Sequence, residues 1–313
     1  MNVAELRHKI QMPALPRVLK FVASRPTVPS SVELPQKAPT TGIDFPTAWA
    51  RRMPARAIRR VVSETLMQSV VTVVLRPTVI GLERLATLSE EEPVIFVANH
   101  SSHADTPLLL RSLPEPWRNK LFVAAAADYF FPNRGTGIAS ALLLNAVPIE
   151  RNKVTRRSAL AGADLIDEGW SMLIYPEGGR SPDGWAQPFR GGAAFLSNRT
   201  HAPVVPIHVS GTAEVMPKGK NWPKPGPTTV TFGEPIRTEG LDSKQLSRLI
   251  ERSVETLADE RQTDWYQARR RFHAGTTPSL GGPDSSGWRK AWALGTAQDE
   301  ERRRGGSKAW PPR

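Results

Sequence analysis

The sequence predicts an α/β fold in which a largely parallel sheet is flanked by helices and preceded by an amphipathic helical segment. Three observations support this prediction. Short apolar runs rich in β-branched residues alternate with helical patterns, as they do in βαβ units. Two of these runs end abruptly on polar residues, as buried strands do at the edge of a parallel sheet. A stretch after Pro54 instead repeats apolar residues at helical intervals.

Apolar runs and helical periodicity place the individual elements. The strands are expected near residues 94–98, 121–126, 146–150, 171–175, 203–209 and 228–232. The helices are expected near residues 107–112, 135–144, 153–168 and 243–260. Strands interleaved with helices in this way are typical of a layered α/β domain.

The first polar cluster follows the run Val94–Ala98, where His100 precedes Asp105 by five residues. Residues five apart on a regular helix are offset by roughly 140° and do not face each other, so residues 100–105 are expected to form a turn. Thr106 as the N-cap and Pro107 at the first helical position would start the next helix. In such a turn, the Asp105 carboxylate can hold one imidazole nitrogen of His100 and leave the other free to accept a proton.

Two other interpretations of this cluster stay open on the residues alone. Asp105 could cap the following helix while His100 closes the strand as an ordinary polar residue. His100, His103 and Asp105 could also ligate a metal ion, but the pattern of a dinuclear hydrolase would require histidines where Ser101 and Thr106 stand. We therefore predict no metal site.

The second polar cluster follows the run Ser171–Tyr175 and reads Pro-Glu-Gly-Gly-Arg. Its adjacent glycines, Gly178 and Gly179, allow the backbone to approach a ligand closely, and Arg180 offers a planar fork that suits phosphate. The cluster therefore predicts an anion cradle. The alternative is a glycine turn with a surface pair between Glu177 and Arg180.

The two clusters together resemble the glycerolipid acyltransferases of the 1-acylglycerol-3-phosphate acyltransferase (PlsC) family. That family carries an NHx4D motif, matched here by Asn99-His100 and Asp105, and an EGTR motif some 70 residues later, matched by Glu177 to Arg180. Gly179 replaces the threonine of EGTR, which removes one hydroxyl donor.

Two further blocks extend the resemblance. The family's second motif, G-x-x-F-I-D-R, aligns with Asn145–Arg151, which keeps the isoleucine, an acid and the arginine but lacks the glycine and the phenylalanine. Its fourth motif, a proline-bounded apolar strand, resembles Ala202–Val209. The four blocks occur in the family's order over roughly residues 77–236, which is far more specific than any one of them.

The resemblance implies transfer of a fatty acyl group from an acyl thioester to the hydroxyl of a lysophospholipid. The expected acceptor is 1-acylglycerol-3-phosphate, and the product is then phosphatidic acid. His100 would act as the general base and return the proton to the leaving thiolate, without a covalent enzyme intermediate. A serine route through Ser101 or Ser102 lacks the G-x-S-x-G elbow. Acyl-CoA or acyl carrier protein would supply the acyl group as a substrate, and no cofactor is expected.

The resemblance also suggests which residues bind the acceptor. Arg151 and Arg180 are candidates for gripping its phosphate, with Gly178 and Gly179 as the cradle. Glu177 is a candidate for contacting a substrate hydroxyl or for holding Arg180. Arg190, in the segment Phe189–Phe195, is a secondary candidate because a helix N-terminus follows it. No residue is singled out as the oxyanion donor.

Charge separates the two ends of the chain from its centre. Residues 1–60 carry a formal charge of +8 and residues 261–313 carry +6, which leaves −2 for the centre of a chain whose total is +12. We expect an anionic membrane surface as the partner of these basic flanks, and nucleic acid is unlikely because no basic helix with base-reading residues is evident.

The membrane segment is expected after Pro54. Its apolar stripe and its basic front end are formed by Ile58, Val62, Leu66, Val70 and Val73 or Val74, and by Arg51, Arg52, Arg56, Arg59 and Arg60. This pattern predicts an interfacial helix, and the alternative for its back half is a helix that packs its apolar stripe on the sheet. In the PlsC family, helices before the first motif are associated with the membrane.

These patterns divide the chain into a flexible basic segment (1–45), a basic amphipathic helical segment (46–76), an acyltransferase domain (77–260) and a basic, disordered tail (261–313). Trp288, Trp292 and Trp310 of the tail could anchor at a lipid headgroup layer. No run of about 18 apolar residues suggests a membrane span, no signal peptide is evident and the chain has no cysteine. We therefore expect a peripheral protein on the cytoplasmic face of the membrane.

Two alternatives to this function remain at the level of sequence. The same chemistry could act on another lyso-lipid acceptor, such as a headgroup-bearing lysophospholipid, a lyso-ornithine lipid or a glycolipid. A non-catalytic protein could also use this fold to bind anionic lipid or nucleic acid. Acyl chain length, the identity of the donor, positional selectivity and oligomeric state have no signature in the sequence.

Overall fold

The computed structural model describes residues 42–150, 156–181, 185–217 and 222–281, all within one compact unit that comprises Thr40–Arg313. Most of the segment predicted to be flexible, residues 1–45, lies outside the described residues, as do Trp288, Trp292 and Trp310.

One sheet forms the centre of the described unit. Its strands are β1 (Pro77–Ile80), β2 (Ile95–Ala98), β3 (Leu121–Ala126), β4 (Ala146–Ile149), β5 (Ser171–Ile174), β6 (Val204–Ser210) and β7 (Thr228–Phe232). They lie in the order β1-β7-β6-β2-β5-β3-β4, and β6 and β7 form the one antiparallel pair among them. The predicted largely parallel sheet is therefore confirmed.

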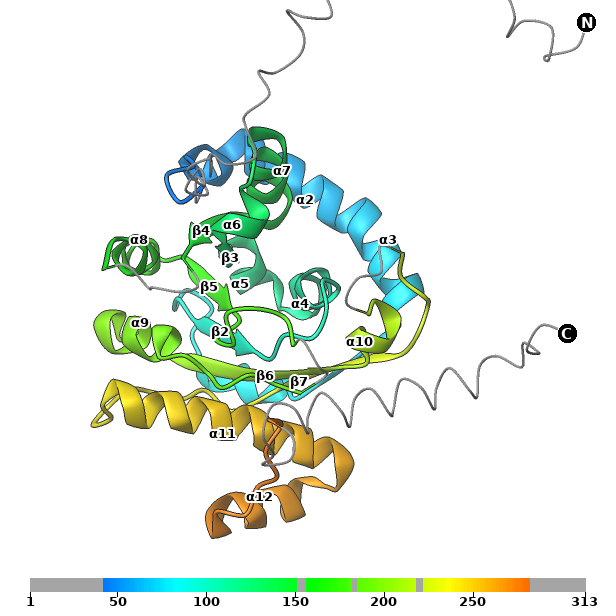
Figure 1. Cartoon of the computed structure of the whole chain (residues 1–313), viewed down its shortest axis with the longest axis vertical. Helices are drawn as coiled ribbons and strands as arrows, with labels where there is room; N and C mark the ends of the chain where they lie inside the picture. The colour runs from blue at the N-terminus through cyan, green and yellow to red at the C-terminus, as the bar shows by residue number, and fades with distance from the viewer. Residues whose placement is uncertain (1–41, 151–155, 182–184, 218–221, 282–313) are drawn as a thin grey trace, which may run out of the picture. The chain divides into compact units, whose positions relative to one another are not determined.

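Helices surround this sheet (Figure 1). An N-terminal helical run comprises η2 (Ala48–Arg51), α2 (Met53–Val62), η3 (Ser63–Met67), α3 (Gln68–Val70) and η4 (Val71–Leu75). The others are η5 (Leu82–Thr87), α4 (Asp105–Ser112), α5 (Glu115–Asn119), α6 (Ala127–Phe130), α7 (Arg134–Leu144), α8 (Arg156–Asp167), α9 (Gly192–Thr200), α10 (Thr212–Val215), α11 (Ser243–Gln262) and α12 (Trp265–Ala274). No helix within the described ranges combines the length and the hydropathy that crossing a membrane requires.

Alternation along the central strands builds two cores. Ile95 and Val97 of β2 join a core with α8, α9 and α11, whereas Phe96 and Ala98 join a core with α4, α5 and η4 on the opposite face. All four side chains are fully buried. Side chains of successive strand residues point to opposite faces, so a strand buried on both sides must be apolar throughout, as this one is.

The N-terminal helical run packs differently from the predicted stripe. η3 and η4 are π-helical, and their wider turns rotate the side chains that follow. Val71 and Leu75 consequently enter the core, while Val70 and Val73 are 46% and 66% exposed. The back half of this segment therefore packs Val71 and Leu75 on the domain, as the alternative interpretation expected, and keeps Val70 and Val73 on the surface.

Arg59 also has a different role from the one predicted. Its guanidinium donates to three backbone carbonyls, those of Leu142 (2.8 Å), Ala141 (3.0 Å) and Ala50 (2.7 Å). The first two belong to the C-terminal turn of α7, where cations are stabilised by the helix dipole. Burial, reinforced by Arg51 and Arg56, lowers the pKa of Arg59 to about 10. This arginine ties α2 to α7 instead of facing lipid.

The C-terminal boundary of the domain lies beyond the predicted residue 260. α11 continues to Gln262, and α12 follows it, so the prediction of disorder is wrong for residues 261–281. Asp264 caps α12 by accepting the Gln267 N–H at 2.8 Å. Arg271 of α12 pairs with the buried Asp259 of α11 at 2.6 Å, which fixes the two helices to each other.

Candidate active site

The two polar clusters meet at one edge of the sheet. β2 and β5 are parallel neighbours, so their carboxyl ends lie together. The His100 N–H donates to Glu177 Oε1 at 2.7 Å, and the Ser181 N–H donates to the His100 carbonyl at 3.0 Å. Two loops that are distant in sequence therefore converge here.

His100 and Asp105 form a dyad in which Asp105 is fully buried and His100 is partly exposed. His100 Nδ1 lies 2.8 Å from Asp105 Oδ2, which also accepts the N–H groups of Ser101 and Ser102 at 2.8 Å each. An ionised carboxylate only accepts hydrogen bonds, so Nδ1 carries the proton and Nε2 is left as the basic nitrogen. The loop thus fixes the tautomer of His100.

The residues that surround Asp105 differ in part from prediction. Of the expected turn at residues 100–105, residues 100–104 are not helical, but Asp105 is the first residue of α4, with Ala104 as its N-cap. Thr106 is therefore not the N-cap. Its hydroxyl lies 3.0 Å from the Tyr175 hydroxyl, so α4 is bonded to the end of β5.

Tyr175 holds the imidazole from the other side. Its ring stacks on that of His100 with centroids 4.1 Å apart and planes inclined by 18°. Burial and the charge of Asp105 raise the pKa of Tyr175 well above its ordinary value, so the hydroxyl stays protonated. With one face stacked and Nδ1 bonded, His100 has little freedom to rotate.

Both oxygens of Glu177 accept hydrogen bonds from the backbone. Its Oε1 accepts the His100 N–H at 2.7 Å and its Oε2 accepts the Gln187 N–H at 2.8 Å. The side chain is 4% exposed, and burial raises its pKa to about 7 although both N–H groups oppose the shift. Among the described residues Glu177 makes no ion pair with Arg180, and its contact with a substrate hydroxyl stays a prediction.

The predicted cradle is assembled from three elements. Gly178 has a φ of +74°, which favours glycine, and a Cβ there would lie 3.0 Å from Cζ of Arg190. Gly179, Arg180, Arg190 and Gly192 line the same cavity. Gly192 is the first residue of α9, whose N-terminal dipole end favours anions.

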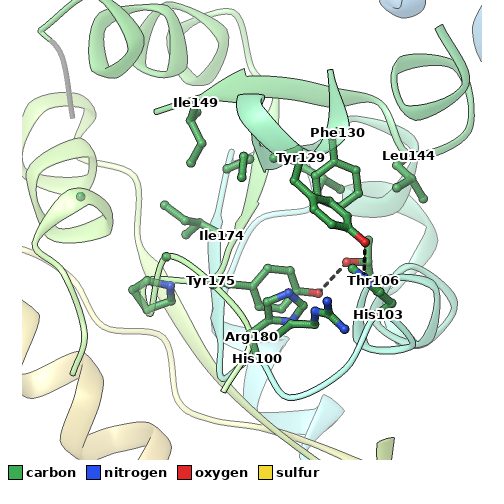
Figure 2. A pocket seen from close by; sticks show the side chains of 18 of the residues that line it. His100, His103, Thr106, Tyr129, Phe130, Leu144, Ile149, Ile174, Tyr175 and Arg180 are labelled. Carbon is green, nitrogen blue, oxygen red and sulfur yellow. Dashed lines mark hydrogen bonds between the residues drawn. The ribbon is translucent and has the colours of Figure 1, made fainter. Parts of the chain in front are cut away.

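Arg180 is the arginine best placed for an anionic ligand. It lines the cavity with His100 (Figure 2), and within the described residues it makes no hydrogen bond or ion pair. Arg151, the other predicted phosphate ligand, lies outside the described residues, although its neighbour Glu150 lines the cavity.

A cavity of about 480 Å³ opens from the dyad. His100 and Arg180 lie together at its polar end, and the cavity is also lined by the polar or charged side chains of His103, Thr106, Tyr129, Glu150, Tyr175 and Arg190. Its apolar lining includes Val123, Ala124, Ala125, Ala126, Phe130, Leu144, Ile149 and Ile174. Figure 2 shows Ile149, Ile174, Phe130 and Leu144 around this space, with His100 and Arg180 below them. The volume is in the range of small-molecule sites.

His103 lies on the rim of this cavity. Its Nε2 is 2.6 Å from the Tyr129 hydroxyl, and the two rings stack with centroids 5.1 Å apart. Burial, with the charges of Arg180 and His100, lowers the pKa of His103 to about 4, so the ring is neutral near pH 7. No group of three or more residues within the described ranges is arranged to hold a metal ion.

The serines of the first loop are bonded away from the cavity. Ser101 Oγ lies 3.1 Å from Thr212 Oγ1, and Ser102 Oγ donates to the Met216 carbonyl at 2.8 Å. Neither serine lines the cavity. The structure gives no support to a serine nucleophile.

Sequence reasoning missed the roles of Thr106, Tyr175 and Tyr129. Tyr175 was visible as the last residue of an apolar run, directly before Pro176 and Glu177, and its position next to the motif was the available signal. Tyr129 had no comparable signal, because it lies in the short helix α6, away from every motif.

Comparison with known proteins identifies relatives of this domain. Residues 76–210 match the family described as Acyltransferase. A chloroplastic 1-acyl-sn-glycerol-3-phosphate acyltransferase of Brassica napus is 34% identical over 143 residues, covering 44% of this chain and 38% of that protein. A 1-acyl-sn-glycerol-3-phosphate acyltransferase of Chlamydomonas reinhardtii is 35% identical over 158 residues, covering 49% and 44%. The chain therefore spans less than half the length of these two relatives.

A bacterial relative and a solved structure extend the similarity. The 1-acyl-sn-glycerol-3-phosphate acyltransferase of Pseudomonas aeruginosa is 29% identical over 194 residues, covering 59% of this chain and 70% of that protein. The crystal structure of the 1-acyl-sn-glycerophosphate (LPA) acyltransferase PlsC from Thermotoga maritima superposes with a TM-score of 0.52 at 23% identity, covering 71% of this chain and 86% of that chain. The PlsC-like fold expected from the motifs is thereby confirmed.

Proposed function

We propose that this chain, whose residues 76–210 belong to the Acyltransferase family, transfers a fatty acyl group from an acyl thioester to the hydroxyl of a lysophospholipid. One observation carries the proposal: the basic Nε2 of His100 and the guanidinium of Arg180 line one cavity together with a set of apolar side chains. A base, an anion ligand and an apolar wall are what an acyl transfer to a phosphorylated lipid alcohol needs.

The chemistry follows from the tautomer of His100. Nε2 takes the proton of the acceptor hydroxyl as its oxygen attacks the thioester carbonyl carbon, and Asp105 stabilises the resulting imidazolium. The tetrahedral intermediate then collapses, the carbon–sulfur bond breaks, and the imidazolium returns the proton to the leaving thiolate. The acyl group never becomes attached to the protein, and no cofactor takes part.

The polar end of the cavity supports a phosphate-bearing acceptor. Arg180, Arg190 and the N-terminus of α9 converge there, and guanidinium groups bind phosphate through charge-assisted hydrogen bonds. The most similar relatives named above act, by their names, on 1-acylglycerol-3-phosphate. We propose the same acceptor for this chain, which makes phosphatidic acid the product.

The apolar part of the cavity is the proposed place of the acyl chain. Each buried methylene group contributes about 0.8 kcal/mol, so a wall of alanine, valine, isoleucine and phenylalanine side chains suits a hydrocarbon. Whether the donor is coenzyme A or acyl carrier protein, only its acyl chain would enter this part of the cavity.

An acyl-transfer assay tests the proposal and separates it from its alternatives. Purified protein is incubated with acyl-CoA or acyl carrier protein thioesters and a panel of lyso-lipids, and products are measured by mass spectrometry. We expect phosphatidic acid from 1-acylglycerol-3-phosphate at the highest rate. Faster acylation of a neutral lyso-lipid would replace the acceptor, and binding of anionic lipid without turnover of any substrate would reduce the protein to a lipid-binding domain.

Peripheral binding to an anionic membrane surface is the second part of the proposal. Among the side chains that the structure describes, the large apolar ones exposed on the N-terminal helical run are Met53 (70%), Ile58 (51%), Val61 (62%), Val70 (46%) and Val73 (66%). α7, which Arg59 ties to α2, exposes Ile138 and Leu143 and contributes Leu144 to the cavity wall. An apolar surface next to the cavity suits a lipid substrate. The cytoplasmic side stays a prediction.

Vesicle co-sedimentation tests this surface. The double variant Val61→Asp/Val73→Asp should lower binding to phosphatidylglycerol vesicles at least tenfold, because it places charge on the apolar face. Leu160→Asp, at a 37% exposed position on α8, is the matched control. Equal binding by both variants would move the membrane surface elsewhere on the molecule.

A further inference from the structure

We propose that residues 276–281, which follow α12, form a brace that positions His100 through the loop of residues 185–190. The expected effect of the brace on turnover rests on the proposed function. The positioning of the loop by the brace rests on hydrogen bonds. The brace belongs to the C-terminal region that the sequence predicted to be disordered.

Backbone N–H groups connect the loop of residues 185–190 to its surroundings. Pro188 has no N–H, and every other N–H from residue 186 to 190 donates to a partner outside the loop. These bonds are Ala186 to the Leu280 carbonyl (3.0 Å), Gln187 to Glu177 Oε2 (2.8 Å), Phe189 to Glu251 Oε1 (3.2 Å) and Arg190 to the Pro176 carbonyl (3.0 Å). The loop therefore takes its position from the elements that accept these bonds.

Leu280 links this loop to α11. Its carbonyl accepts the Ala186 N–H at 3.0 Å, while its own N–H donates to Glu255 Oε1 at 3.2 Å. Glu251, one helical turn before Glu255, accepts the Phe189 N–H. Two carboxylates on one face of α11 thus hold both the loop and the brace.

α12 delivers the brace to this place. Gly275 ends the helix with a φ of +71°, and the Thr276 N–H bonds back to the Arg271 carbonyl at 2.9 Å. This left-handed cap reverses the chain toward α11. In Figure 1, α12 lies beside the C-terminal half of α11, to which Arg271 and Asp259 tie it.

The path from the brace to the dyad contains one buried side chain. Gln187, held between Ala186 and Phe189, donates to Glu177 Oε2, and Glu177 Oε1 accepts the N–H of His100. Release of the loop would remove one donor from a buried carboxylate, which is costly, and would shift the backbone of His100. Small displacements of a catalytic group can lower a rate by up to about 10²-fold.

The test uses variants of the full chain. Glu251→Ala/Glu255→Ala removes both acceptors, Glu251→Gln/Glu255→Gln keeps an amide oxygen at each position, and Arg248→Ala is an exposed control on the same helix. We expect the alanine pair to lower kcat about tenfold with the acceptor KM changed less than twofold. The glutamine pair and the control should stay within twofold of wild type.

Amide hydrogen exchange gives a readout that does not depend on turnover. The alanine pair should accelerate exchange in peptides covering residues 186–190 and 100–102, and the glutamine pair should not. An alanine pair that folds, with unchanged exchange and unchanged kcat, would overturn the brace. A wild-type protein without activity on any lyso-lipid would overturn the proposed function instead, and exchange alone would then decide whether the brace holds the loop.

Discussion

The motifs that follow β2 and β5 each contain a buried carboxylate, and the two carboxylates have different roles. Asp105 bonds to the ring of His100 as well as to two backbone N–H groups, so it acts on the group that reacts. Glu177 bonds to two backbone N–H groups and to no side chain that reacts. The comparison teaches that an acid in a motif can serve chemistry in one loop and architecture in the next.

The largest effect that separates the two loops should come from His100. His100→Ala removes the base and should lower kcat about 10³-fold with lipid binding unchanged. His103→Ala, in the same loop and on the rim of the same cavity, is the control and should stay within about tenfold of wild type. Turnover by His100→Ala equal to that of the control would reject the base.

A smaller effect should come from the guanidinium of the second loop. Arg180→Ala should raise the acceptor KM about 30-fold and the donor KM less than threefold, because a charge-assisted hydrogen bond is worth about 1.5–3 kcal/mol. Arg199→Ala, exposed at the opposite end of α9, is the matched control. An equal rise in both KM values would remove Arg180 from the acceptor site.

Glu177→Gln should have the smallest effect on catalysis. Glutamine offers one acceptor oxygen to two N–H groups, so kcat should fall about tenfold while the acceptor KM changes little. Glu214→Gln, an exposed acid on α10, is the control. A kcat loss as large as that of His100→Ala would mean that Glu177 takes part in the chemistry, which would erase the distinction between the loops.

The same variant should change how stability depends on pH. The pKa of Glu177 is raised to about 7 in the folded protein from an ordinary 4.5. Between these values the folded state holds a proton that the unfolded chain releases, so this group's contribution to the free energy of unfolding falls as pH rises from about 4.5 to about 7. Glu177→Gln should remove that fall, measured by thermal unfolding across the window against Glu214→Gln. An identical pH dependence in both variants would contradict the raised pKa.

Sequence reasoning reached the parts of the site that follow from strand ends and spacing. His100, Asp105 and the glycine segment stand directly after two apolar runs, and parallel strands bring such ends together. The rule that carboxyl ends of parallel strands meet was sufficient for these residues, because each lies within a few residues of a strand end.

The remaining contacts depend on geometry that no local pattern encodes. Thr106 meets Tyr175 across 69 residues, and Arg59 meets the end of α7 across more than 80. The π-helical turns of η3 and η4 shift which side chains of the helical run face the core, whereas the stripe assumed 3.6 residues per turn. The tail was misjudged because its composition outweighed the caps at Asp264 and Gly275.

Asn99 connects the segment that carries His100 to the neighbouring strand β6. Its amide donates to the Val209 carbonyl at 2.9 Å and accepts the Val209 N–H at 2.7 Å, which copies the pairing of a strand residue with a side chain. β2 is thereby fastened to β6 one position past its own last residue. An ionised aspartate has the same shape but cannot donate a hydrogen bond. Asn99→Asp would therefore remove the bond to the Val209 carbonyl and weaken the attachment of the residue next to His100.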